Sequence, residues 1–373
     1  MSTGIHPLLM PKWGISMREG RILEWLVKEG DPTTAGDEIV EVETDKIVAS
    51  VETSSGGVLR RRVAREGEVL PVGALLGVLA DPGTADAEID RFVLDFEAQP
   101  ILEASDELAQ ADTTETVRVG DRTIHFIRQS GEGEPLILVH GFGGNLNNWL
   151  FNREALAAGR DLYALDLPGH GGSSKDVGEG GTEDLAEVLR GFMEALEIGR
   201  AHLVGHSLGG AVALTCALEA PGRTASLTLI ASLGLGAEIN APYIEGFVTA
   251  RKRKDLASQV VRLFGDPSLV TRPMVEDLLR FKRLDGVQGG LQRIADQLLV
   301  GGMQRVALAA RLEELAAPPL VIWGEKDEIV PSSHARAVAG RAVIALIPGA
   351  GHMVQMEAAG EVNRLILERI NQA

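Results

Sequence analysis

The chain has 373 residues, which is enough for two or three domains with at least one large hydrophobic core. Its formal net charge of −17 argues against binding to nucleic acid through phosphate contacts, and no apolar run is long enough to span a membrane. A single cysteine, Cys216, excludes an intrachain disulfide, and the amino terminus lacks the regions of a signal peptide. We therefore expect a cytoplasmic protein without nucleic-acid or membrane partners.

Glu43-Thr44-Asp45-Lys46 lies between two runs of alternating apolar residues, 39–42 and 47–51. This alternation predicts two strands. Thr44-Asp45-Lys46 is then expected at the tip of a hairpin, with the Lys46 amine in water. An exposed lysine on a turn is by itself usually only a solubilising charge, so the significance of Lys46 depends on the sequence around it.

The surrounding sequence contains an internal repeat. Glu29-Gly30 recurs as Glu66-Gly67, and Gly36 recurs as Gly73, at an offset of 37 residues. Matching glycines suggest matching turns, because glycine tolerates a positive φ. Two similar halves made of short strands predict a small all-β domain, a flattened β-barrel.

This stretch resembles a lipoyl domain over roughly residues 5–80, in the segments "MPKWGISMREGRILEWLVKEGD", "GDEIVEVETDKI" and "EGEVLPVGALLGVLA". The resemblance implies a domain over residues 1–80 that carries lipoate in amide linkage on Lys46, attached by a lipoate ligase or lipoyl transferase. The alternative group is biotin, which uses a similar fold. Biotin domains prefer Met on both sides of the lysine, whereas Asp45 and Ile47 stand there in this chain.

Residues 81–115 form an acidic segment, with eleven acidic residues and one basic residue, Arg91. This composition predicts a flexible linker between two domains, with a short helix at Ile89–Phe96. A flexible coil of this length has a root-mean-square span of roughly 30–35 Å, and like charges extend it further. The segment therefore suits a carrier domain that must swing between sites.

Residues 116–373 are predicted to form a second, larger α/β domain. Buried-type strands alternate with helices after a hairpin at Gly120-Asp121, which favours a mostly parallel sheet. The expected strands are Leu136–Val139, Leu162–Leu165, Ala201–Val204, Leu227–Ile230, Leu320–Trp323 and Val343–Ile347, and the expected helices are Asn147–Ala157, Thr182–Leu196, Leu208–Glu219, Ser333–Ala339 and Ala359–Ile370. Residues 236–312 interrupt the alternation with amphipathic helical patterns and an excess of basic residues, so we expect a helical cap there.

Two glycine-rich motifs follow predicted strands of this domain. Gly205-His206-Ser207-Leu208-Gly209 opens a helix directly after a strand, the context in which a sharp turn presents a nucleophilic serine. His140-Gly141-Phe142-Gly143-Gly144 follows an earlier strand, and its glycines allow a backbone N–H to approach that serine. The amides of Phe142 and Leu208 are therefore the expected donors of an oxyanion hole.

Asp327 and His352 follow two later strands, so the order Ser207, Asp327, His352 is that of a catalytic triad. In this arrangement His352 removes the serine proton, and Asp327 orients the imidazole. Glu325 is a weaker candidate for the acid and His206 for the base, while Cys216 is interpreted as core filler. Together these motifs resemble the α/β-hydrolase family over roughly residues 116–373.

The two domains together resemble the acyltransferase component of acetoin-cleaving (acetoin dehydrogenase) systems. The resemblance implies a dihydrolipoyllysine-residue acetyltransferase that moves acetyl from the lipoyl arm on Lys46 to coenzyme A through Ser207. Its implied partners are a thiamine-diphosphate-dependent acetoin-cleaving enzyme and a flavin-dependent dihydrolipoyl dehydrogenase. The chain departs from most lipoyl-bearing acyltransferases, because Asp285-Gly286 has no His before it that would complete a His-x-x-x-Asp-Gly motif.

Other functions remain open at this point. The second domain alone suggests a serine esterase or thioesterase that uses water as its acceptor, and the chain could also be a carrier with an inactive second domain. Arg251-Lys252-Arg253-Lys254 is a candidate site for the phosphates of coenzyme A, although such a run is more often only a solvated helix face. No metal site is predicted.

Overall fold

The computed structural model describes residues 5–11, 19–34, 37–44, 48–53, 56–98 and 114–372. These residues belong to two compact units that divide after residue 111. Each unit has its own hydrophobic core.

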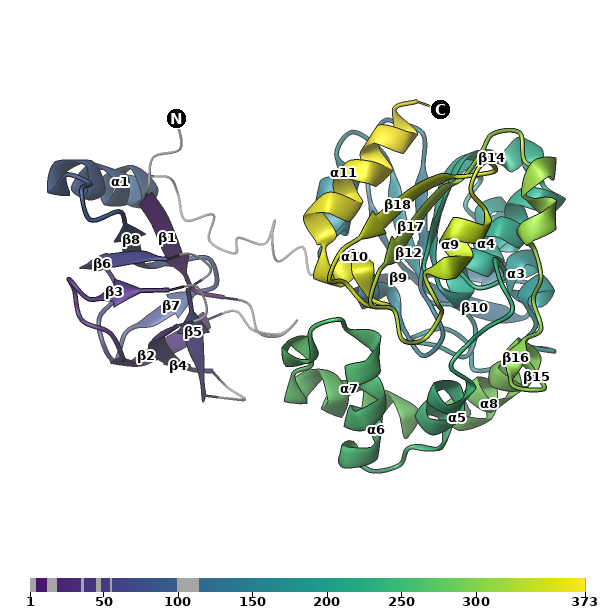
Figure 1. The fold of residues 1–373 in the computed structure, drawn as a ribbon, viewed down its shortest axis with the longest axis horizontal. Helices are drawn as coiled ribbons and strands as arrows, with labels where there is room; N and C mark the ends of the chain where they lie inside the picture. Colours follow the sequence, from purple (N-terminus) through teal and green to yellow (C-terminus); the bar gives the residue numbers. More distant parts are fainter. Residues whose placement is uncertain are drawn as a thin grey trace. The chain divides into compact units, whose positions relative to one another are not determined.

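The first unit consists of two antiparallel sheets of four strands each, ordered β1-β8-β6-β3 and β5-β4-β2-β7 (Figure 1). Apolar residues from both sheets form one core, which includes Ile22, Val42 and Leu76. The predicted small all-β barrel is thereby confirmed. Its strands are β1 (Ile5–Leu9), β2 (Glu19–Trp25), β3 (Pro32–Thr33), β4 (Glu38–Glu43), β5 (Val48–Glu52), β6 (Gly57–Arg62), β7 (Val69–Pro71) and β8 (Leu75–Ala80).

The turns of the internal repeat have matching backbone conformations. Gly30 and Gly67 occupy equivalent turns of the two halves and have φ angles of 94° and 84°. This left-handed region is accessible to glycine without the steric cost that a Cβ would bring. Gly73 also has a positive φ of 84°, and its counterpart Gly36 lies outside the described residues.

The β4–β5 hairpin has the predicted place in the barrel. β4 and β5 pair antiparallel, and Glu43 is the last residue of β4 to pair, opposite Val48 of β5. The connection between them comprises residues 44–47. Lys46 belongs to this connection and itself lies outside the described residues.

Helix α1 (Asp86–Ala98) occupies the first half of the predicted linker and is longer than the expected stretch Ile89–Phe96. It packs on the first unit because Ile89 is completely buried against Val78 and neighbouring apolar residues of β8. Arg60 and Arg61 of β6 make ion pairs with Asp86 and Asp90 of the helix. The linker is therefore partly structured, and residues 99–113 lie outside the described part of the chain.

The second unit is built on an eight-stranded sheet with the order β18-β17-β14-β13-β11-β12-β10-β9. The six strands from β12 to β18 pair in parallel, while β9 and β10 form the antiparallel edge. This mostly parallel sheet confirms the predicted fold class. Its strands are β9 (Thr114–Val119), β10 (Arg122–Gln129), β11 (Leu136–Val139), β12 (Leu162–Leu165), β13 (Ala201–His206), β14 (Thr224–Ile230), β17 (Leu320–Gly324) and β18 (Val343–Ile347).

Helices cover both faces of this sheet (Figure 1). α3 (Thr182–Ala195) and α4 (Leu208–Glu219) pack in the larger core, and α2 (Arg153–Ala157) and α11 (Ala359–Ile370) pack in the other. The prediction of one continuous helix at 147–157 is wrong. The chain forms a short 3₁₀ helix, η1 (Leu146–Trp149), before α2. The two helices are separate because the side chain of Asn152 donates hydrogen bonds to Gln355 and Asn363 in the carboxyl-terminal segment.

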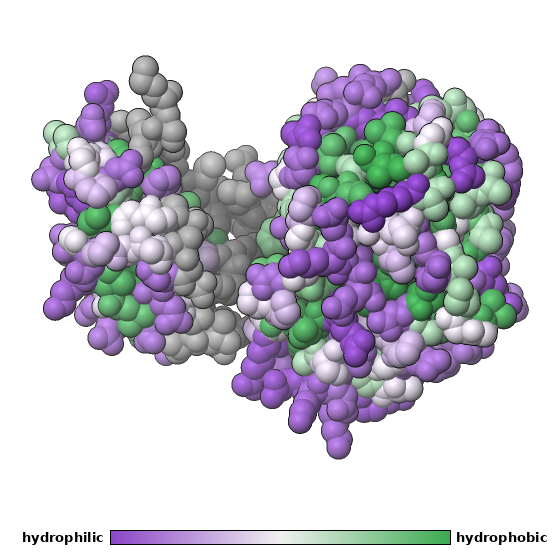
Figure 2. All heavy atoms as spheres, viewed as in Figure 1, coloured by the Kyte–Doolittle hydropathy of each residue, from purple (hydrophilic) through white to green (hydrophobic). Residues whose placement is uncertain are grey.

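Residues between β14 and β17 contribute the cap. Its helices lie together at one end of the larger unit (Figure 1) and are α5 (Ala241–Thr249), α6 (Arg253–Val260), α7 (Arg272–Lys282) and α8 (Val287–Leu298). A short hairpin of β15 (Leu299–Val300) and β16 (Met303–Gln304), which the sequence analysis did not predict, follows α8. The face drawn in Figure 2 is mostly hydrophilic on both units, also over α6 and α7. No helix among the described residues is long and apolar enough to cross a membrane.

Candidate active site

Ser207 stands at the sharp turn between β13 and α4. Its backbone angles, φ 53° and ψ −116°, lie outside the regions that L-residues prefer, which is a local strain typical of functional positions. The turn depends on glycines on both sides of the serine. A Cβ on Gly205 would lie 2.2 Å from the carbonyl oxygen of Gly209, and a Cβ on Gly209 would lie 2.3 Å from that of Val139.

Asp327 and His352 follow the carboxyl ends of β17 and β18. His352 Nδ1 lies 2.8 Å from Asp327 Oδ2, and both side chains are buried. The other carboxylate oxygen of Asp327 accepts hydrogen bonds from the N–H groups of Ile329 at 2.8 Å and Val330 at 2.9 Å. The carboxylate is therefore fixed as an acceptor, so that His352 Nδ1 donates and Nε2 is left with its lone pair.

His206 connects the serine turn to the histidine loop. Its Nε2–H donates to the carbonyl oxygen of His352 at 3.0 Å, and the two imidazole rings lie 4.8 Å apart. Ser207 Oγ and His352 Nε2 each lack a hydrogen-bond partner among the described residues and keep accessible surface. Unliganded enzymes often hold such pairs loosely until substrate binds. The structure thus brings the three predicted residues to the carboxyl ends of β13, β17 and β18, at one edge of the parallel sheet.

The loop after β11 carries the predicted oxyanion donor Phe142. Within the described chain, neither the N–H of Phe142 nor that of Leu208 has an acceptor. The loop is held by two buried imidazoles that act as acceptors, since the N–H of Gly143 donates to His170 Nε2 and that of Leu167 to His140 Nε2, both at 3.0 Å. Burial lowers the pKa of His170 to about 3 and also lowers the pKa of His140, so both rings stay neutral.

The weaker candidates from the sequence have other contacts in the structure. Glu325 is exposed and makes an ion pair with Arg336 at 3.4 Å. Cys216 is buried on α4, and burial raises the pKa of its thiol to about 11, which keeps it in the unreactive protonated form. His206 donates its Nε2–H to the backbone carbonyl of His352, so this nitrogen is already engaged.

The cap contributes residues that the sequence analysis missed. Asn240, just before α5, donates from its backbone N–H to Ile329 and from its side chain to Glu328, which ties the cap to the Asp327 loop. Glu357 accepts from Gly351 beside His352 and from Gly265 of the cap, at 2.7 and 2.8 Å. Neither residue belongs to a recognisable motif, so sequence spacing carried no signal for them.

Arg251-Lys252-Arg253-Lys254 lies on the surface of the cap, and it spans the end of the α5–α6 connection and the first two residues of α6. All four residues are exposed, and none makes an ion pair with another described residue. The cationic charge of this run is therefore available to an anionic ligand.

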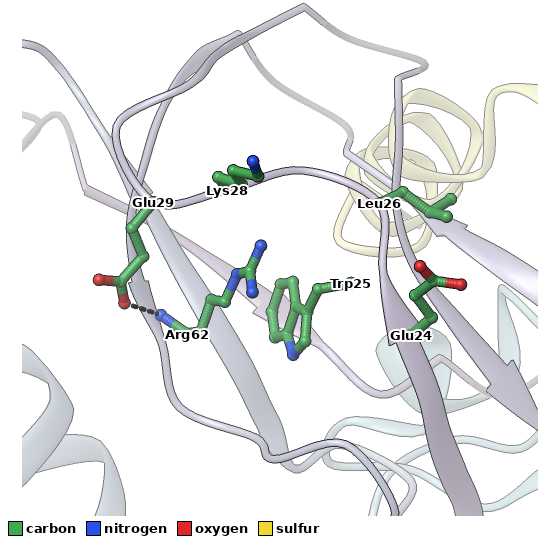
Figure 3. Close-up of a pocket in the computed structure, with 6 residues that line it drawn as sticks. All are labelled: Glu24, Trp25, Leu26, Lys28, Glu29 and Arg62. Carbon is green, nitrogen blue, oxygen red and sulfur yellow. Dashed lines mark hydrogen bonds between the residues drawn. The ribbon is translucent and has the colours of Figure 1, made fainter.

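The first unit has a surface pocket of about 660 Å³ (Figure 3). The Arg62 guanidinium lies 5.3 Å from the centre of the Trp25 ring, and both side chains face this hollow. Trp25 pairs with Val40, whereas Arg21 nearer the other end of β2 pairs with Glu43, so the pocket lies away from the end of β4 that Glu43 occupies. It is lined by Glu24, Trp25, Leu26, Lys28, Glu29 and Arg62.

The fold and the site define a class. The chain has an α/β-hydrolase fold with a serine, a histidine and a carboxylate at strand ends, joined to a lipoyl- or biotinyl-type domain. Comparison with known families agrees with this class. The family described as "alpha/beta hydrolase fold" matches residues 134–359, and the family described as "Biotin-requiring enzyme" matches residues 6–79.

Full-length relatives narrow the class further. The dihydrolipoyllysine-residue acetyltransferase component of the acetoin cleaving system of Pseudomonas putida is 51% identical over 364 residues, which cover 97% of this chain and 98% of the relative. The component of the same name from Cupriavidus necator is 44% identical over 370 residues, with 99% and 98% covered. The chain therefore belongs to the family of these acetyltransferase components.

A solved structure extends the comparison of the fold. The crystal structure of a meta-cleavage product hydrolase has a TM-score of 0.62 and 24% identity, and the match covers 69% of this chain and 98% of that one. At this identity the likeness shows the fold alone.

Proposed function

We propose that the protein is the dihydrolipoyllysine-residue acetyltransferase of an acetoin-cleaving system, which moves acetyl from a lipoyl arm on Lys46 to coenzyme A through Ser207, His352 and Asp327. One observation carries the proposal: a lipoyl-type barrel and a buried serine site occur in one chain, as in relatives that are named acetyltransferase components of acetoin cleaving systems. The match covers 98% of each of these relatives. A carrier in the same chain as a serine site supplies that site with its own substrate.

The described hairpin fits a prosthetic group at Lys46. β4 ends at Glu43 and β5 begins at Val48, so Lys46 belongs to a short connection at the end of the sheet, with no second lysine between the two strands. Lipoate in amide linkage there would carry acetyl as a thioester on a long, mobile arm. A lipoate ligase or lipoyl transferase, a thiamine-diphosphate-dependent acetoin-cleaving enzyme and a flavin-dependent dihydrolipoyl dehydrogenase are the partners that this role requires.

Acylation of the serine is the first step of the proposed mechanism. His352 Nε2 takes the proton of Ser207 Oγ, which forms a bond to the carbonyl carbon of an acetyl thioester. The N–H groups of Phe142 and Leu208 stabilise the oxygen as it becomes negative. The carbon–sulfur bond then breaks, and His352 returns the proton to the departing sulfur. Asp327 holds the imidazole in the tautomer that this exchange needs.

Transfer to coenzyme A is the same chemistry in reverse. His352 Nε2 takes the proton of the coenzyme A thiol, whose sulfur attacks the acetyl group on Ser207, and the serine recovers the proton when its bond to carbon breaks. The apolar core of the cap, which includes Phe247 and Leu291, is suited to keep competing water from the acyl-serine.

We further propose that Arg251-Lys252-Arg253-Lys254 holds the phosphates of coenzyme A. The four cations are exposed and free of ion pairs among the described residues. α5 has nine residues and is therefore about 13 Å long, and it leads from the Asp327 loop to this run. Phosphates bound at the run could thus send an extended arm toward the serine. Replacing all four by Gln should raise the KM for coenzyme A about tenfold and leave the KM for the acetyl donor within twofold of wild type.

The second candidate is a thioesterase that transfers acetyl to water. It is favoured by one observation: a 2-hydroxy-6-oxo-6-phenylhexa-2,4-dienoate hydrolase of Burkholderia cepacia is 32% identical over 289 residues, which cover 70% of this chain and 98% of that enzyme. The product distinguishes the two functions. With an acetyl thioester and coenzyme A present, a transferase forms acetyl-coenzyme A and a thioesterase forms free acetate.

A further inference from the structure

Tyr243 of α5 has a hydroxyl group without a partner. The residue is 97% buried, since its relative exposure is 3%. Among the described residues no group forms a hydrogen bond with this hydroxyl, and yet its oxygen keeps accessible surface. Ser207 Oγ and His352 Nε2 share both properties. A buried hydroxyl is normally paired, so an unpaired one that interacts electrostatically with Asp327 indicates a group that bonds to a ligand.

The position of Tyr243 is fixed from both ends of its helix. Asn240 ties the start of α5 to the Asp327 loop, and the ammonium of Lys282 donates to the carbonyl oxygens of Phe247 and Val248 at its end. The Tyr243 ring lies 6.1 Å from the ring of Phe247, which in turn lies 5.8 Å from that of Phe142 in the oxyanion loop. Tyr243 therefore lies on a helix that is tied to the Asp327 loop at its start and that contacts the oxyanion loop through Phe247.

We propose that the Tyr243 hydroxyl binds the sulfur atom of the thiol carriers, donating a hydrogen bond to the sulfur that leaves the acetyl group and to the sulfur that attacks it. The inference rests on the proposed acetyl transfer and adds to it a residue that selects sulfur leaving groups. The two carriers of that reaction are a dihydrolipoyl arm and coenzyme A, and each of them bears the acetyl group on a thiol sulfur.

The chemistry of each half-reaction places negative charge on the sulfur atom, which is the acceptor of the proposed hydrogen bond. When Ser207 Oγ bonds to the acetyl carbon, the carbon–sulfur bond breaks and sulfur departs with the bonding electron pair, while the serine proton passes through His352 to that sulfur. Burial raises the pKa of Tyr243, and the nearby Asp327 carboxylate raises it further, so the phenol keeps its proton and acts only as a donor. A hydrogen bond to a charged acceptor is stronger than one between neutral groups.

Tyr243→Phe tests the inference, because it removes only the oxygen and keeps the packed ring. We expect kcat/KM for free S-acetyl-dihydrolipoamide to fall about tenfold, and to fall at least five times more than kcat/KM for p-nitrophenyl acetate, whose leaving group is stable without a donor. The matched control is Tyr163→Phe, which removes the hydroxyl of the other tyrosine in the chain. Tyr163 lies on β12 and bonds to Asp161, so its variant should behave as wild type with both esters.

Binding provides a second readout that does not depend on turnover. Wild-type protein should bind coenzyme A more tightly than desulfo-coenzyme A, and Tyr243→Phe should lose that preference. Equal losses with the two esters, an unchanged thioester rate, or a preference that survives in the variant would each overturn the inference. If wild-type protein instead releases acetate and forms no acetyl-coenzyme A, the proposed transferase function fails, while the ratio between thioester and oxygen ester still decides the role of Tyr243.

Discussion

Asp327 is the residue on which the orientation of the base depends. One of its oxygens binds His352 Nδ1 and the other accepts two backbone N–H groups, so all of its near neighbours are donors. In Asp327→Asn an NH₂ group placed against the two N–H donors would lose both hydrogen bonds, so the NH₂ turns to the imidazole. We expect kcat for an acetyl thioester to fall about 10³- to 10⁴-fold, because the imidazole is then held in the wrong tautomer.

Glu325→Gln is the matched control for this prediction, since Glu325 lies two residues earlier and makes an ion pair with Arg336 at the surface. It should retain at least half of the wild-type kcat. A comparable loss in both variants, or a near-normal rate in Asp327→Asn, would show that Asp327 does not orient the base.

Among the contacts between elements, hydrogen bonds of Glu357 link the cap to the loop that contains His352. Both oxygens of Glu357 are occupied, one by Gly351 next to His352 and the other by Gly265 of the cap, and Met353 donates its N–H to Leu263 of the cap at 3.0 Å. Glu357 is thus a positioning residue that holds a cap segment against the loop of the base.

In Glu357→Gln the amide oxygen can still accept one of the two hydrogen bonds, from Gly351 or from Gly265. The NH₂ group then faces the other backbone N–H, and that hydrogen bond is lost. We expect kcat to fall five- to tenfold with little change in the KM for the acetyl donor, together with a loss of about 1–3 kcal/mol in the free energy of unfolding. Glu361→Gln, four residues on, removes only an exposed ion pair with Arg364 and should change neither quantity appreciably. A rise in KM without a fall in kcat would instead place Glu357 in substrate binding.

Several elements were predictable because their signals are local. The strands Leu136–Val139, Leu162–Leu165 and Val343–Ile347 have the expected bounds, since short apolar runs flanked by glycine or polar residues leave little choice of structure. The motifs around Ser207 follow for the same reason. α1 was only partly predicted, because its docking depends on ion pairs and apolar contacts with strands that are distant in sequence.

The missed residues of the site share a different cause. Tyr243, Asn240 and Glu357 act through contacts between the cap and the loops of the sheet, and sequence spacing does not encode which helix face meets which loop. The aromatic pair Tyr243 and Phe247, four residues apart on a helix, was the one available signal. The structure shows which loop each of these residues meets, and no sequence motif contains that information.

At the scale of the whole molecule, buried neutral histidines make the larger unit sensitive to acid. Burial lowers the pKa of His140, His170 and His206, in the case of His170 to about 3. Between this value and the ordinary pKa of about 6.5, the unfolded chain binds protons that the folded unit does not. Stability should therefore be full above about pH 7 and fall as the pH drops below 6.5, by about 1.4 kcal/mol per pH unit for His170, and His140 and His206 add to this slope in the same direction.

Denaturant unfolding of the full chain between pH 4 and pH 8 measures this slope. His170→Gln should reduce it by about one proton, that is by about 1.4 kcal/mol per pH unit. His6→Gln, in the first unit, should leave the transition of the larger unit unchanged. A free energy of unfolding that stays level down to pH 4 would show that these imidazoles are not kept neutral by the fold.

The central claim is that acetyl carried on Lys46 is unloaded to coenzyme A by the serine site of the same chain. The most direct measurement is the intact mass of protein from its own host, lipoylated, reduced and S-acetylated, before and after addition of coenzyme A. We predict that wild-type protein loses one acetyl group and yields an equal amount of acetyl-coenzyme A, that Ser207→Ala keeps its acetyl group, and that Lys46→Arg never bears one. Lipoyl-free native protein, or acetyl lost equally fast from Ser207→Ala, would contradict the account.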